Sequence, residues 1–198
     1  MSTVFHMLEI MNAALISEGF EDIVSENDGS DEWRLLSRNW PLIVEPELED
    51  GQFAFTKRQT FLATRSDGNY GYDDAYLVPV SALHVRRVWT EEQDGTRNML
   101  EWTQDGERVY VNDQPDGVFI EYAEAADTSF WSANFSRGVQ MKLQAVLLRF
   151  KEERAAASEM DQQAEIYFQR ARTISSKSRS ATEPYKKGRI ARARFGHG

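Results

Sequence analysis

The sequence predicts an α+β fold: a helical bundle of two N-terminal and two long C-terminal helices, an inserted antiparallel β-meander and an extended C-terminal arm. Near both ends of the chain, apolar residues recur every three or four positions, which is typical of helices that pack on one face. Between these regions, short apolar segments alternate with Asp-Gly turns, which indicates antiparallel strands. We expect one helical domain from residues 1–50 and 124–177, an inserted β-domain at 51–123 and an extended basic arm at 178–198.

Two helices are predicted before residue 50. The first spans 3–18, where Gly19 supplies a stop. The second begins near residue 30 or 31, after a polar loop that ends in residues able to cap a helix. Pro41 and Pro46 predict that this second helix kinks or ends early.

The middle of the chain predicts strands joined by turns. Residues 52–64 alternate in the manner of a strand, and residues 66–74 are rich in Gly, Asp and Tyr, which indicates a long exposed loop. Within that loop, Asn69, Tyr70 and Tyr72 are candidates for a tail-side or inter-subunit contact. Asp94-Gly95 and Asp105-Gly106 are hairpin dipeptides. Four short antiparallel strands follow from these turns, at residues 83–90, 97–103, 107–111 and 118–122.

The helical period returns after Asp127. An apolar stripe predicts a long helix, and Ser158 is positioned to cap a last one. The period fades after Ile174, so the remaining residues are interpreted as an extended arm. The stripe of the first of these helices consists of Val139, Leu143, Val146, Leu147 and Phe150.

Charge divides the chain into an acidic body and a basic tail. Residues 170–198 contain nine Lys or Arg and one acid, whereas residues 1–169 contain 14 bases and 31 acids. Aromatic and aliphatic residues lie among the bases of the tail, which favours an arm that docks on an acidic surface. The charge pattern is also compatible with a solvated tail or with a tail that binds nucleic acid. The candidate binding residues are Tyr185, Lys186, Lys187, Arg189, Arg192, Arg194 and Phe195.

Composition argues against several classes of function. The chain has no Cys, its three His lie far apart in sequence, and no nucleotide-binding or hydrolase motif occurs, so we expect no enzyme activity, no metal site and no cofactor. No apolar run approaches the roughly 20 residues that span a bilayer, and the first residues do not resemble a secretory signal. The five Trp residues are assigned to the core or to a subunit interface.

The order of these segments resembles the head-to-tail adaptor proteins of tailed bacteriophages, also called head–tail connector or tail tubular protein A-like proteins. The resemblance covers nearly the whole chain, from the first predicted helix to the basic end. Each motif is degenerate, and their order and spacing together carry the resemblance. The matching segments are EWRLLSRNW at 32–40, FAFTKR at 53–58, YLVPVSALHVRRV at 76–88, DGERVY at 105–110, VFIEY at 118–122, DTSFWSANF at 127–135 and GRIARAR at 188–194.

The resemblance implies a structural virion protein of the neck, assembled in the host cytoplasm. Such proteins form a ring, typically a dodecamer, between the portal and the next tail or nozzle protein. The ring continues the channel through which DNA passes during ejection, without sequence-specific binding. The C-terminal arm is implied to bind the portal or a neighbouring subunit. The alternative is a nucleic-acid-binding accessory protein that acts through the basic tail; an enzyme with an unrecognised carboxylate site ranks last.

Overall fold

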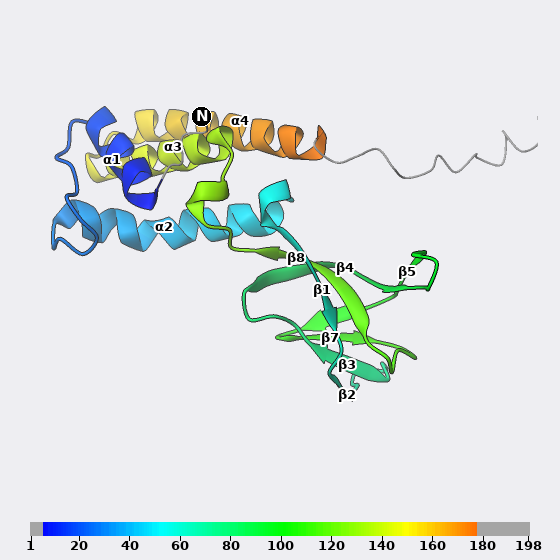
Figure 1. Ribbon diagram of the computed structural model, residues 1–198. Helices are drawn as coiled ribbons and strands as arrows, with labels where there is room; N and C mark the ends of the chain where they lie inside the picture. The colour runs from blue at the N-terminus through cyan, green and yellow to red at the C-terminus, as the bar shows by residue number, and fades with distance from the viewer. Residues whose placement is uncertain (1–5, 178–198) are drawn as a thin grey trace, which may run out of the picture.

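The computed structural model describes residues 6–177, which form an α+β fold (Figure 1). The helices lie together on one side of the molecule and the strands on the other. The predicted arm at 178–198 and the start of the first predicted helix lie outside the described residues. The helices are α1 (Met7–Ser17), α2 (Asp31–Asp50), α3 (Ala133–Phe150) and α4 (Arg154–Lys177), with short 3-10 turns η1 (Ala54–Thr56) and η2 (Thr128–Phe130).

The β part consists of eight strands where the sequence predicted a single meander, so the prediction of a helical bundle with an inserted β-meander is wrong. They form two antiparallel sheets of four strands, in the orders β1-β8-β4-β5 and β2-β3-β7-β6. Each sheet needs the other to bury its apolar face. The strands are β1 (Lys57–Leu62), β2 (Arg65–Asp67), β3 (Asp74–Leu77), β4 (Ala82–Glu91), β5 (Arg97–Met99), β6 (Thr103–Asp105), β7 (Arg108–Val111) and β8 (Val118–Glu124).

An apolar cluster lies between the two sheets. Val85, Val88 and Ile120 from the first sheet pack with Tyr76 and Val109 from the second. The predicted strand at 97–103 is split, because its two ends pair in different sheets: β5 pairs with β4, and β6 pairs with β7. The sheets therefore make up a layered half of the fold with apolar residues between them, which one meander cannot provide.

Helix α2 is continuous through Pro41 and Pro46, so the predicted early end is wrong. A proline inside a helix removes one backbone hydrogen bond, and the loss is tolerated where packing holds the helix in place. Leu36, Val44 and Leu48 are buried along α2 and hold it in the helical core, whereas Pro46 lies on the exposed side, where solvent can reach the freed carbonyl.

The helical core is built around Phe135 of α3. Its ring meets Phe53 edge-on, with 4.8 Å between centroids, and Phe168 of α4 at 5.4 Å. Gly138, one turn along α3, lets α4 approach closely, because a Cβ there would lie 2.6 Å from the Phe168 ring. Helix α4 begins at Arg154, so Ser158 lies inside it and the predicted cap at that residue is wrong.

Candidate interaction site: an acid-rimmed tryptophan cavity

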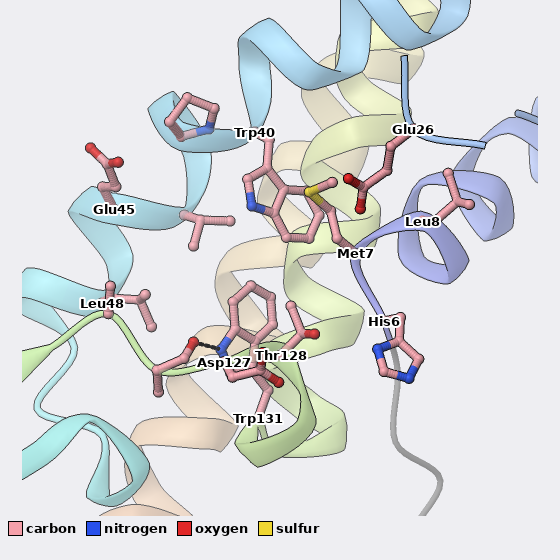
Figure 2. A pocket seen from close by; sticks show the side chains of 14 residues that line it. His6, Met7, Leu8, Glu26, Trp40, Glu45, Leu48, Asp127, Thr128 and Trp131 are labelled. Carbon is pink, nitrogen blue, oxygen red and sulfur yellow. Dashed lines mark hydrogen bonds between the residues drawn. The ribbon is translucent and has the colours of Figure 1, made fainter. Parts of the chain in front are cut away.

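A cavity of about 580 Å³ opens where the start of α1, the middle of α2 and the η2 turn meet (Figure 2). Its lining comes from the start of α1, the loop before α2, α2 itself and the segment at 125–131. Trp40 and Trp131 lie in its middle, with Met7 and His6 to one side and Leu48 on the other. The remaining lining residues are Leu8, Glu26, Pro41, Val44, Glu45, Ala125, Ala126, Asp127 and Thr128.

The two tryptophans form a rigid aromatic wall. Their rings stack with 5.6 Å between centroids and 10° between planes. The Trp131 indole Nε1 donates to the carbonyl of Ala126 at 2.9 Å, the bond drawn in Figure 2, and the ring also meets buried Phe135 edge-on at 4.6 Å. Because Trp131 is fixed by both contacts, the wall is held in place by the helical core.

Local capping positions this wall. Asp127 caps η2 by accepting from the Ser129 backbone N at 2.8 Å, and Ser132 caps α3 by accepting from the Phe135 N at 3.3 Å. The sequence predicts a long helix after Asp127, and the Ser132 cap marks the start of that helix at Ala133. Between the two caps the chain turns so that the Trp131 side chain faces α2.

Negative charge surrounds the opening of the cavity. Glu26, Glu45 and Asp127 are exposed at its rim. Hydrogen bonds from the Ser129 side chain and backbone lower the pKa of Asp127, so this carboxyl is ionised at neutral pH. An apolar floor with aromatic faces and a carboxylate rim fits a basic side chain or a basic segment of another protein. Within residues 6–177, no group of His, Asp and Glu side chains could hold a metal ion.

The predicted loop residues Asn69, Tyr70 and Tyr72 all lie in one tight turn between β2 and β3, on the opposite part of the molecule (Figure 1). The predicted length of the loop is therefore wrong, because strands occupy both of its ends, whereas the predicted exposure of Asn69 and Tyr70 is confirmed. Gly68 N donates to the Asp73 carbonyl at 3.0 Å, and Tyr72 N donates to the Asn69 carbonyl at 3.0 Å. These bonds close the turn.

Tyr70 is anchored to the sheet although its side chain is 62% exposed. Its hydroxyl donates to Asp105 Oδ2 at 2.7 Å, and this hydrogen bond raises the pKa of the phenol. Its ring meets Tyr110 edge-on at 5.5 Å. A tail-side or inter-subunit contact of this turn remains a prediction.

The other predicted site residues lie outside the described part of the chain; they are Tyr185, Lys186, Lys187, Arg189, Arg192, Arg194 and Phe195. The tryptophan cavity was not predicted as a site. Trp40 and Trp131 had been assigned to core or interface positions, but 90 residues separate them, and no local pattern shows that they stack. In the structure Trp40 and Trp131 are half-buried, so each contacts the helical core and also lines the cavity.

No protein-family model and no curated protein sequence matches the chain. Among solved structures, one similar chain comes from a structure described as "Neck of empty GTA particle computed with C6 symmetry". That chain is 13% identical, the match covers 73% of this chain and 82% of the other, and the TM-score is 0.26. No helix within residues 6–177 has the length and apolar character needed to cross a membrane. The proposed link to the adaptor family therefore rests on the resemblance in sequence.

Proposed function

We propose that the chain is a structural subunit of a bacteriophage neck, a head-to-tail adaptor without enzymatic activity that forms a ring between portal and tail. The order of the sequence motifs from residue 32 to residue 194 supports this proposal. Subunits of a closed ring need two unlike complementary surfaces, because each contact is heterologous and the rotation must close.

The observation that carries the proposal is a pair of unlike apolar surfaces on different parts of the fold. One is the tryptophan cavity beside α2. The other is an aromatic row across the first sheet, where Phe61 of β1, Phe119 of β8 and Trp89 of β4 are register neighbours. Phe61 is 46% exposed, whereas Phe119 is half-buried and Trp89 is buried, with the Arg97 guanidinium over its ring. Phe61 is thus the aromatic side chain of this row that is open to a partner protein.

Charge is compatible with the rest of the proposed role. The acidic body disfavours phosphate binding, as a channel wall past which DNA slides requires. The basic arm at 178–198 binds the portal or an adjacent copy, where its bases pair with carboxylates. The proposed ring, typically of twelve subunits, also contacts the next tail or nozzle protein, with the turn that holds Tyr70 as a candidate contact.

Sedimentation of the intact chain with and without the portal protein of the same phage tests the proposal. The expected result is a monomeric or weakly associated protein alone and a stoichiometric complex with the portal. Duplex DNA serves as the comparison partner. DNA binding that weakens steeply with salt, together with no portal complex, would replace the adaptor role by the nucleic-acid accessory role.

A further inference from the structure

A second hollow, with a volume of about 480 Å³, lies at one end of the first sheet. The turn before β8 forms part of its lining. We name it the acidic–aromatic groove. Two phenylalanines contribute apolar surface, and three carboxylates surround them. Its residues are Phe61, Thr90, Glu91, Asp113, Gln114, Pro115, Asp116, Gly117 and Phe119.

The aromatic part of the groove faces away from the second sheet. Side chains alternate along a strand, and the neighbours Leu62 and Val118 pack in the cluster between the sheets. Phe61 and Phe119 therefore lie on the outer face, where their ring centroids are 4.8 Å apart. Phe119 also stacks on Trp89 at 5.8 Å, so the outer row continues onto β4.

The turn that carries the carboxylates is held from beneath. Asp74 is buried, and its Oδ2 accepts a hydrogen bond from the backbone N of Gln114 at 2.7 Å. The hydroxyl of Tyr76 donates to the backbone carbonyl of Gln114, and Arg65 forms an ion pair with the other oxygen of Asp74. These contacts fix the backbone between Asp113 and Asp116, so the groove is formed before any partner binds.

Gly117 brings this turn against the aromatic floor. Its φ is +107°, and a Cβ at this residue would lie 2.5 Å from the Phe61 ring. Only glycine combines that backbone conformation with that approach. The groove thus has a defined shape, with one wall from the turn and one from the ends of β1 and β4.

The charge of the groove is negative and largely uncompensated. Within residues 6–177, neither Asp113 nor Asp116 forms an ion pair, and Glu91 has only a 3.7 Å contact with Arg97. Such a surface repels phosphate groups and attracts a basic peptide that also carries an apolar side chain.

The chain itself contains such a peptide beyond Lys177. Residues 178–198 hold six Lys or Arg and a single acid, with Tyr185, Ile190 and Phe195 at regular intervals of five residues. The basic charge complements Glu91, Asp113 and Asp116, and an aromatic side chain complements the exposed Phe61. The segment at 178–198 and the acidic–aromatic groove therefore carry charges of opposite sign.

We infer that the acidic–aromatic groove binds residues 178–198 of a second copy of this chain, with an aromatic side chain on Phe61 and basic side chains on the carboxylates. The inference rests on the proposed ring, in which the arm of one subunit would reach the groove of the next.

A labelled synthetic peptide of residues 178–198, added to the intact protein, tests binding directly. Asp113→Asn with Asp116→Asn removes two charges, and Asn suits the positive φ of residue 113. We expect this double variant to weaken peptide binding about fivefold at low salt. Phe61→Ala is expected to weaken peptide binding about tenfold. A peptide that carries Tyr185→Ala with Phe195→Ala should bind the unchanged protein about tenfold more weakly as well.

The matched control is Glu21→Gln with Asp22→Asn, which removes the same charge from an exposed loop outside both cavities and is expected to leave peptide binding unchanged. The tryptophan cavity is the competing acidic site, so Glu26→Gln with Glu45→Gln tests whether the peptide binds there instead. Unchanged binding by the Asp113/Asp116 variant, or a loss confined to the Glu26/Glu45 variant, overturns the inference. Since the Asp and Glu substitutions are on the surface, thermal unfolding should show that these variants fold.

Photocrosslinking distinguishes a second copy from the same chain. A photoreactive phenylalanine analogue at position 195 is introduced into full-length protein, and isotopically light and heavy copies are mixed and bound to portal. Crosslinks between light and heavy chains that map to Phe61 or to residues 113–119 support the inference, whereas crosslinks to residues 125–131 would place the arm at the tryptophan cavity and overturn it. Crosslinks within one chain, or to the portal alone, overturn it while leaving the ring intact; absence of a portal-bound ring would overturn the proposed function instead.

Discussion

Asp74 of β3 accepts a hydrogen bond from the backbone N of Gln114 across 2.7 Å, and so ties one sheet to the turn that leads into the other. Asp74 is 1% exposed, and Arg65 supplies the counter-charge. A buried carboxylate with both oxygens engaged is typical of a structural anchor, because its partners lose their bonds together when it is removed.

Asp74→Ala is expected to lower the free energy of unfolding by about 2–4 kcal/mol, because the Gln114 N–H loses its acceptor and the Arg65 guanidinium loses its ion-pair partner. Chemical denaturation measures the change. The neighbouring Asp73 is exposed and provides the control, since Asp73→Ala should cost no more than about 0.5 kcal/mol. Equal effects at both positions would show that Asp74 is not an anchor.

Gly138→Ala tests the close approach of α3 and α4. Alanine is favoured over glycine in an isolated helix by about 1 kcal/mol. Here its Cβ would meet the Phe168 ring at 2.6 Å, so we expect a net loss of about 1–3 kcal/mol. Thermal unfolding gives the sign. A stabilised variant would mean that the two helices can separate without cost.

Acid stability should depend on Glu121 of β8. Burial, the largest single influence, raises the pKa of this carboxyl. Hydrogen bonds from Lys57, at 2.6 Å, and from Gln59, at 3.1 Å, together with the Lys57 and Arg87 charges, outweigh it and hold the pKa below its ordinary value. A carboxyl with a lowered folded-state pKa stabilises the fold above its unfolded-state pKa, and this contribution is lost as pH falls through the folded-state value.

The unfolding free energy should consequently decrease as pH falls from about 4.5, the ordinary pKa of Glu, through the lower folded-state value. Denaturation curves collected from pH 7 to pH 3 measure the slope. Glu121→Gln should be less stable at pH 7 and show a shallower decline in acid. A variant with the same slope as the unchanged protein would assign the acid sensitivity to other groups.

Local signals predicted much of the fold. The Asp94-Gly95 and Asp105-Gly106 turns are confirmed, with φ of +82° at Gly95 and +55° at Gly106. The strands β2 and β3 were missed because a segment rich in Asp, Gly and Tyr shows no apolar alternation. In the structure β3 pairs with β7, and β2 pairs with β3. The predicted α+β class agrees with the structure, whereas the predicted single meander is wrong because the second sheet was not recognised.

The interaction surfaces could not be predicted because they depend on distant pairings. Trp40 meets Trp131 only when α2 packs beside the η2 turn. The row of Phe61, Phe119 and Trp89 requires β8 to lie between β1 and β4, an order that no local pattern specifies. Composition did indicate a basic arm, but it gave no location for the surface that receives it.

Electron microscopy of the intact chain mixed with its portal protein tests the central proposal most directly. We expect an additional ring of density on one face of the portal, absent when the chain is omitted. Averaged images of that ring would show repeated subunits closing around an open channel. Both proteins are mixed at concentrations well above the expected dissociation constant of their complex. Portal particles that look the same with and without the chain would then contradict the adaptor role.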